Sequence, residues 1–298
     1  MKLPFGLPRE EFLLPGHTAC PGCGATIALR IVMKALGPRT VFVIPACCST
    51  VIQGIFPGSS FAVPVVNIPF EAAAAVAAGV SAALEQLGEK DFSVVAWAGD
   101  GGTFDIGLQA LSGAAERNDN ILYICYDNEM YSNTGIQRSS ATPIGAWTTT
   151  TPTGKREHKK DLLRIVSAHH VPYAATATIA FPKDLYEKVR KARQIRGFKF
   201  LHILTPCPVG WRFDASKTVE ISRLAVQTGY WALYEIEHGK LRISPAFTPY
   251  LDKSRRKPID EFLKHQLRFR TMTPELKAEL ERAIEEGIER LKREAELV

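Results

Sequence analysis

The sequence lacks any apolar run long enough to cross a lipid bilayer. The longest candidate, Ala72 to Leu84, is short and rich in alanine, and Glu71 precedes it, whereas a transmembrane helix needs about 20 apolar residues. The N-terminal residues 1–6 also lack the apolar core of a secretory signal peptide. We therefore expect a cytoplasmic protein that does not associate with membranes.

The two most basic segments lack aromatic residues between their charges. The chain carries a formal net charge of +6, and basic residues gather at 155–160 and 253–257. Proteins that bind single-stranded nucleic acid interleave such charges with aromatic side chains. A nucleic-acid-binding protein would explain the charge and nothing else, so we expect no nucleic-acid partner. A solvated surface, or one that attracts an acidic protein, explains both segments.

Internal repeats and low-complexity segments are also missing, and the 298 residues instead alternate between strand and helix patterns. This alternation predicts an α/β fold with a doubly wound, mostly parallel sheet. The expected strands are 40–44, 61–68, 94–98, 121–126, 171–177 and 199–205, and the expected helices are 25–36, 71–87, 105–117, 160–169 and 183–194. Residues 129–160 show no clear periodicity, and we interpret them as a long functional loop.

Three regions follow from this pattern. Residues 1–15 form an N-terminal arm, residues 16–215 a cofactor-binding domain, and residues 216–298 a C-terminal extension. In the extension we expect a helix at 221–234 and a strand at 240–244. A last amphipathic helix begins with Thr273 as a cap and Pro274 in its first turn. Its apolar stripe consists of Leu276, Leu280, Ile284, Ile288 and Leu291.

The chain is organised around the apolar segment that ends in Gly99-Asp100-Gly101-Gly102. Asp100 follows a predicted buried strand and precedes a helical pattern, which is where open α/β sheets bind ligands. A helix N-terminus and glycine-rich backbone suit a phosphate group. A carboxylate at this position suits Mg²⁺, which prefers oxygen ligands and bridges to phosphate oxygens.

A second oxygen ligand follows the next predicted strand. Asn128 lies behind the apolar segment 121–126, one crossover helix after Asp100, so the two strand ends can be neighbours in a parallel sheet. This arrangement resembles the thiamine diphosphate motif. The resemblance implies that Asp100, Asn128 and the Met130 carbonyl hold Mg²⁺ on the diphosphate, at a turn formed by Gly99, Gly101 and Gly102.

Cysteine is scarce, and five of the six cysteines lie close to predicted element ends. Cys20 and Cys23 form a Cys-x-x-Cys pair before a helix, Cys47 and Cys48 follow one strand, and Cys207 follows another. If the sheet is parallel, four of these thiolates converge near Asp100. Four cysteine ligands suit zinc or a [4Fe–4S] cluster equally. The sixth, Cys125, lies within a strand and is expected to be a buried, small apolar residue.

The combined motifs resemble the β subunit of pyruvate:ferredoxin oxidoreductase (pyruvate synthase), within the 2-oxoacid:ferredoxin oxidoreductase family. The likeness covers residues 12–215 in unbroken order and is carried by GHTACPGCG, a further cysteine, GDGGTFDIG, YDNEMYSNTGIQRSSATP and PCPVGW. It implies that Cys20, Cys23, Cys48 and Cys207 hold a [4Fe–4S] cluster, with Cys47 as the alternative to Cys48. It also implies that Asn133 lies near the reacting carbon.

The resemblance implies oxidative decarboxylation of pyruvate to acetyl-CoA and CO₂, with coenzyme A as co-substrate and reversible electron transfer to ferredoxin. The implied partners are an α subunit, a γ subunit, a ferredoxin-like δ subunit and external ferredoxin. No acidic residue here matches the family's pyrimidine-side glutamate, which belongs to the α subunit, so the chain alone should be inactive. Two alternatives stay open: the same chemistry on 2-oxoisovalerate, 2-oxoglutarate or oxalate, and a non-enzymatic zinc-binding protein.

Overall fold

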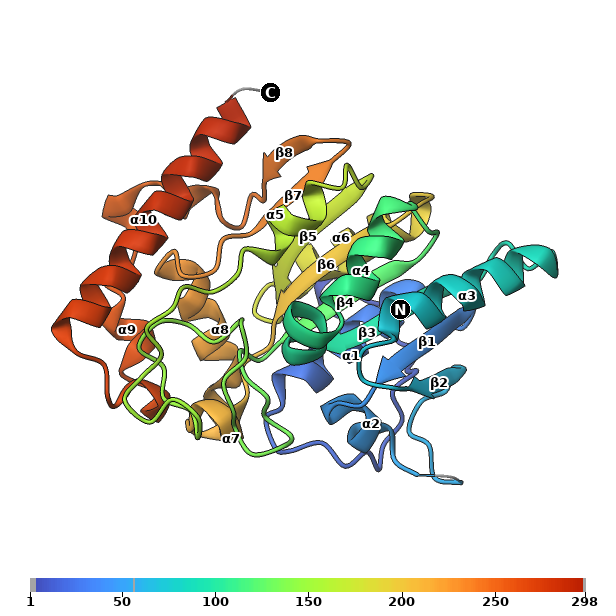
Figure 1. Ribbon diagram of the computed structural model, residues 1–298, viewed down its shortest axis with the longest axis horizontal. Helices are drawn as coiled ribbons and strands as arrows, with labels where there is room; N and C mark the ends of the chain where they lie inside the picture. The colour runs from blue at the N-terminus through green and yellow to red at the C-terminus, as the bar shows by residue number, and fades with distance from the viewer. Residues whose placement is uncertain (1–3, 56, 297–298) are drawn as a thin grey trace.

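A computed structural model describes residues 4–55 and 57–296 (Figure 1). Within these residues, one sheet contains eight strands in the order β2-β1-β3-β4-β6-β5-β7-β8. The bounds of the strands are β1 Thr40–Pro45, β2 Val65–Ile68, β3 Ser93–Gly99, β4 Leu122–Asp127, β5 Tyr173–Thr178, β6 Lys199–Leu204, β7 Tyr234–Glu237 and β8 Lys240–Ile243.

The strands from β1 to β6 run parallel to their neighbours, and the β7–β8 hairpin extends the sheet in antiparallel pairing. This confirms the predicted doubly wound, mostly parallel α/β fold. The parallel strands are apolar almost throughout because helices cover both of their faces.

Helices from different parts of the chain cover the two faces of the sheet. On one face, α1 (Gly24–Leu36) and α6 (Pro182–Gln194) pack on alternate residues of the strands, such as Phe42 and Trp97. On the other face, α3 (Ala73–Gln86), α4 (Leu108–Glu116) and α5 (Leu162–Ser167) pack on the intervening residues. The period of two along each strand therefore divides the core into two layers.

A third apolar cluster holds the C-terminal extension against the sheet edge. It is formed by α8 (Thr218–Gln227), α9 (Asp260–Leu263) and α10 (Pro274–Glu296), and Figure 1 shows α10 running beside β8. The predicted last helix is confirmed, and Leu280, Ile288 and Leu291 of its stripe are buried. The remaining short elements are η1 Pro4–Gly6, α2 Cys48–Gln53, η2 Gly101–Ile106, α7 Pro208–Trp211, η3 Ala215–Lys217, η4 Thr248–Leu251, η5 Lys253–Arg255 and η6 Leu267–Phe269.

Several predicted elements need correction. The strand predicted at 61–68 begins only at Val65, because Pro64 has no N–H to donate to a neighbouring strand. The helix predicted at 221–234 ends at Gln227, since Gly229 turns the chain with a φ of 79°, and β7 follows instead. The helix predicted at 105–117 begins as the π-helical segment η2 at Gly101. The helix α2 was not predicted.

No helix in the described part of the chain combines the length and the apolar character needed to span a bilayer.

Truncation of Ile288 tests how strongly α10 is anchored. Ile288 is 2% exposed and packs in the third apolar cluster. Ile288→Ala should lower the free energy of unfolding by about 2–5 kcal/mol, the usual cost of deleting a buried isoleucine side chain. Urea unfolding of the chain, followed by circular dichroism, measures this difference. The matched control is Leu87→Ala on the exposed end of α3, and equal midpoints for the two variants would contradict the predicted anchoring.

Candidate cofactor-binding site

Four of the candidate ligand segments follow parallel strands and therefore lie at one edge of the sheet. From β1 the chain leads outward to β2, whereas β3 lies on the other side of β1 and leads to β4. The crevice between the ends of β1 and β3 is therefore a topological switch point, the usual ligand position in such sheets. Cys48 follows β1, Asp100 follows β3, Asn128 follows β4 and Cys207 follows β6. Figure 1 shows α2 and α7, which begin next to these cysteines, along the same lower edge.

Asp100, Asn128 and Met130 bring polar atoms to one point. One end of the Asn128 side-chain amide lies 3.2 Å from Asp100 Oδ1 and 2.7 Å from the Met130 carbonyl oxygen. Ser132 Oγ lies 3.0 Å from the same end. With its oxygen at this end, Asn128 completes a set of three converging oxygens, which is the ligand chemistry of Mg²⁺. With its nitrogen there, the amide donates to both oxygens and satisfies them without a cation.

The electrostatics of Asp100 favour a cation in this position. The side chain is buried, and burial raises the pKa of its carboxyl well above the ordinary value, with a further contribution from Asp127. The Ser139 hydroxyl, which donates to Asp100 Oδ2 at 2.6 Å, opposes this rise. A divalent cation would supply the missing positive charge and keep the carboxylate ionised.

Close packing requires glycine in the turn around Asp100. A Cβ atom on Gly101 would lie 2.2 Å from a ring atom of Tyr131, and one on Gly102 would lie 3.0 Å from the Phe70 ring. The Tyr131 hydroxyl donates to Asp105 Oδ2 at 2.8 Å, which fixes the ring over the turn. Glycine is therefore needed in this turn because aromatic rings pack against its backbone.

The segments that carry the cysteines are tied together by their backbones. The Gly24 N–H, next to Cys23, donates to the Pro206 carbonyl at 3.2 Å. The Cys23 N–H donates to the Cys20 carbonyl at 3.1 Å, which closes the Cys-x-x-Cys turn. These contacts place the Cys-x-x-Cys turn beside Cys207.

The thiols also influence one another electrostatically. Burial raises the pKa of the Cys48 thiol, and Cys207, Cys47 and Cys23 add to this rise. Burial likewise raises the pKa of Cys207, with contributions from Cys23 and Cys20. Cys20 is exposed, and Cys23, Cys48 and Cys207 are half-buried. Neighbouring thiols become thiolates when a positively charged metal group compensates them, which is the chemistry that the four predicted cysteines would offer.

Cys47 and Cys48 face different surroundings. Cys47 contacts the Tyr126 hydroxyl, whose pKa burial raises, and it packs against the core layer of α1. For Cys48, the strongest neighbouring charge is that of Cys207. The assignment of Cys48 rather than Cys47 as a ligand stays a prediction.

Among residues 4–55 and 57–296, no three His, Cys, Asp or Glu side chains converge closely enough to hold one metal ion. A single zinc ion needs its sulfurs about 2.3 Å from the metal, whereas a four-iron cluster holds them around a larger body.

The remaining residues singled out in the sequence lie outside the two ligand sets. Asn133 is exposed in the loop that follows β4. Cys125 is fully buried within β4, which confirms its interpretation as a core residue. Sequence reasoning missed a group of charges behind Asn128, formed by the buried residues Asp127, Glu129, His202 and Arg268 together with half-buried Lys159. The available signal was an aspartate and a histidine within the otherwise apolar strands β4 and β6.

Comparison with known proteins identifies the family of the chain. Residues 47–203 match the family model described as thiamine pyrophosphate enzyme, C-terminal TPP binding domain. The chain is 53% identical to ketoisovalerate oxidoreductase subunit VorB of Pyrococcus abyssi, covering 98% of this chain and 96% of the relative. It is 51% identical to pyruvate synthase subunit PorB of Methanothermobacter marburgensis, covering 96% and 99%.

A solved structure of 2-oxoglutarate:ferredoxin oxidoreductase from Magnetococcus marinus, with 2-oxoglutarate, coenzyme A and succinyl-CoA bound, resembles the chain with a TM-score of 0.59 and 25% identity. The match covers 75% of this chain and 80% of that one. Fold and site together define a thiamine diphosphate-binding domain. More specifically, the chain belongs to the PorB and VorB family of 2-oxoacid:ferredoxin oxidoreductase subunits.

A methyl group on Gly101 should weaken thiamine diphosphate binding. Gly101→Ala would press Cβ into the Tyr131 ring and displace the turn beside Asp100, so we expect the dissociation constant to rise by about tenfold or more, as for a supporting residue of a metal site. Titration calorimetry with thiamine diphosphate and Mg²⁺ measures it. Gly113→Ala in α4 is the matched control, because its Cβ would meet only the flexible end of Arg117. Equal affinities of the two variants would refute this role of the turn.

Proposed function

We propose that the chain is the catalytic β subunit of a pyruvate:ferredoxin oxidoreductase, which converts pyruvate and coenzyme A to acetyl-CoA and CO₂ and passes the electrons to ferredoxin. The observation that carries this proposal is the convergence of two different ligand sets at one sheet edge. An oxygen set is formed by Asp100, Asn128 and Met130, and a thiol set is formed by Cys20, Cys23, Cys48 and Cys207. A zinc-binding protein would leave the oxygen set unexplained.

The residues of the chain would hold and orient the cofactors. Asp100, Asn128 and the Met130 carbonyl would hold Mg²⁺, and the glycine turn would admit the diphosphate. Bound there, thiamine diphosphate would supply the carbon centre for decarboxylation, and a [4Fe–4S] cluster would accept electrons one at a time. Asn133, exposed at the mouth of the loop, would face the substrate side. The Cys48 thiol, within electrostatic reach of Asp100, would place the cluster beside the diphosphate site.

A partner subunit would complete the site. Large apolar side chains are exposed in segments at the ligand-bearing edge, namely Val51, Ile55, Ile106, Val209 and Leu267. Such a group of exposed apolar residues is typical of a protein–protein contact. We propose that an α subunit covers this edge and supplies the pyrimidine-side glutamate. A γ subunit and a ferredoxin-like δ subunit would complete the complex and lead electrons to external ferredoxin.

A second substrate has specific support. The relatives include ketoisovalerate oxidoreductase and pyruvate synthase subunits at nearly equal identity, 53% and 51%. The same chemistry on 2-oxoisovalerate is therefore the alternative function. Anaerobic assays of the purified complex with each 2-oxoacid, coenzyme A and ferredoxin discriminate between them. The proposal predicts the highest kcat/KM for pyruvate, and a higher value for 2-oxoisovalerate would replace pyruvate with the branched substrate.

The cysteine assignment predicts a difference between two adjacent substitutions. Cys48→Ser should remove most of the iron and acid-labile sulfide that copurify with this subunit, because it deletes one of the four thiols of the thiol set. Cys47→Ser should retain both, because Cys47 faces Tyr126. Anaerobic metal analysis of the two variants measures this difference. Cluster loss only in Cys47→Ser would exchange the two assignments, and zinc without thiamine diphosphate in the wild type would refute the redox function.

A further inference from the structure

A group of six polar side chains, four of them buried and two half-buried, lies directly behind the candidate magnesium ligands. We call this group the charge cluster; it consists of Asp127, Glu129, Lys159, His202, Tyr230 and Arg268. The proposed function assigns no task to any of its members. Its two acidic residues flank Asn128 on either side, so the cluster and the ligand share one short stretch of chain.

Asp127, the residue before Asn128, is held by three contacts of its side chain. Its Oδ2 atom lies 2.7 Å from Lys159 Nζ and 2.7 Å from His202 Nε2. Its Oδ1 atom accepts the backbone N–H of Glu129 at 2.8 Å. Asp127 therefore ties the backbone on both sides of Asn128 to Lys159 in the loop and to His202 of β6.

Glu129, the residue after Asn128, is likewise held by contacts of its side chain. Its Oε1 atom accepts the Tyr230 hydroxyl at 2.6 Å and Lys159 Nζ at 3.2 Å. Its Oε2 atom forms an ion pair with Arg268 at 2.7 Å, and both side chains are fully buried. Glu129 has a φ of 63°, a left-handed conformation that a residue with a side chain adopts only when its surroundings enforce it.

Arg268 connects the charge cluster to the backbone of Asn128 itself. Its guanidinium lies 3.6 Å from the centre of the Trp211 ring. The Trp211 indole N–H in turn donates to the Asn128 carbonyl at 2.7 Å. The carbonyl of the ligand residue is thus held from behind, while its side chain faces Asp100.

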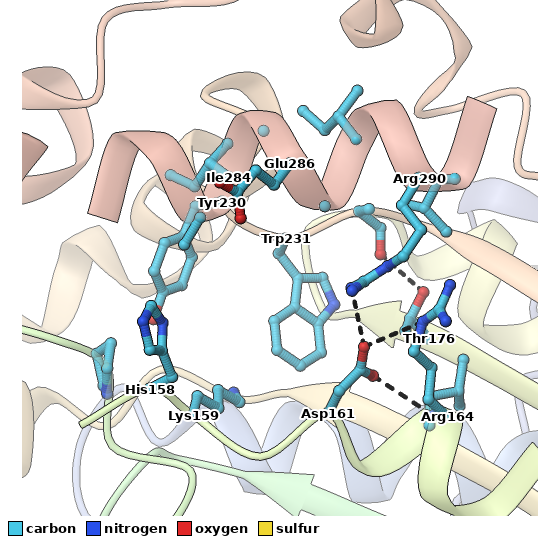
Figure 2. Close-up of a pocket in the computed structure, with 18 of the residues that line it drawn as sticks. His158, Lys159, Asp161, Arg164, Thr176, Tyr230, Trp231, Ile284, Glu286 and Arg290 are labelled. Carbon is cyan, nitrogen blue, oxygen red and sulfur yellow. Dashed lines mark hydrogen bonds and ion pairs between the residues drawn. The ribbon is translucent and has the colours of Figure 1, made fainter. Parts of the chain in front are cut away.

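Lys159 is the centre of the cluster because it alone bridges the two acidic residues. It comes from the far end of the loop that begins with Glu129, so it closes that loop over the ligand segment. Its ammonium group also lies 4.8 Å from the centre of the Trp231 ring. Both residues line a cavity of about 400 Å³ beneath α10, and Figure 2 shows Trp231 and Lys159 opposite Ile284 of that helix.

Stability alone does not account for this arrangement. Buried ion pairs gain little over apolar residues of the same volume, because removing the charges from water offsets their attraction. What a rigid set of ion pairs does provide is one fixed geometry, and outer partners of this kind orient metal ligands.

We propose that the charge cluster is a positioning device for the magnesium site. It holds Glu129 in its left-handed conformation, and this conformation turns the Asn128 side chain and the Met130 carbonyl toward Asp100. Lys159 is the principal positioning residue. This inference rests on the proposed function, because it assigns the cluster to the same magnesium and diphosphate site.

Lys159→Met in the assembled, anaerobically purified complex tests the proposal. With thiamine diphosphate at a fixed high concentration, the dissociation constant of Mg²⁺ should rise by about 10–100-fold, the usual effect of losing an outer partner of a metal ligand. Titration calorimetry and the fluorescence of the complex, to which Trp211 contributes, measure this constant independently of turnover. The kcat at saturating Mg²⁺ should recover toward the wild-type value, a separation that a general folding defect would not produce.

Lys188→Met is the matched control. Lys188 is a lysine buried more deeply than Lys159, and it donates to Asp184, Ser244 and the Thr176 carbonyl rather than to a member of the charge cluster. It should leave Mg²⁺ affinity unchanged. If Lys159→Met fails to assemble, Tyr230→Phe replaces it in the test. This variant removes the hydroxyl that donates to Glu129 and should weaken Mg²⁺ binding by about 2–5-fold.

The outcomes separate the two claims. If the wild-type complex binds no thiamine diphosphate with Mg²⁺, the proposed function itself fails. If the wild type binds both, and Lys159→Met or its substitute Tyr230→Phe binds Mg²⁺ as tightly as Lys188→Met does, the positioning role of the charge cluster is overturned.

Discussion

The parallel pairing of β1, β3, β4 and β6 is the constraint on which the rest of the structure depends. Strands that run in one direction end at one edge, so segments separated by more than 100 residues of chain meet there. The thiols after β1 and β6 and the oxygens after β3 and β4 owe their proximity to this register. A change in strand order would separate Cys48 from Asp100 without altering any ligand.

The fold and the family were predictable from the sequence because their signals are local. Asp100 and Asn128 each follow a short apolar run, and the cysteine pair 20 and 23 precedes a periodic helix. The short helix α2 escaped prediction because six residues carry too little periodicity. The sequence did not predict the strand β7, because its residues continue an apolar run that also suits a helix. Only the turn at Gly229 separates β7 from the helix α8.

The charge cluster shows what sequence reasoning could not reach. Lys159 stands in a basic segment that suggested solvated surface, yet it bridges two buried acidic residues. Arg268 lies far along the chain in the C-terminal extension, where no motif points to the cofactor edge. The role of such residues is recognisable only in the folded structure, where the buried carboxylates of Asp127 and Glu129 require hydrogen-bond or ion-pair partners. The C-terminal extension therefore contributes Tyr230 and Arg268 to the charge cluster behind Asn128.

We propose that one sheet edge holds both an iron–sulfur cluster and a magnesium–diphosphate site. Diffraction from anaerobic crystals of the complex, recorded on both sides of the iron absorption edge, tests it most directly. We predict an iron signal surrounded by Cys20, Cys23, Cys48 and Cys207. We also predict a metal bound by Asp100, Asn128 and the Met130 carbonyl beside the diphosphate. A zinc signal among the cysteines, or a diphosphate bound away from Asp100, would contradict it.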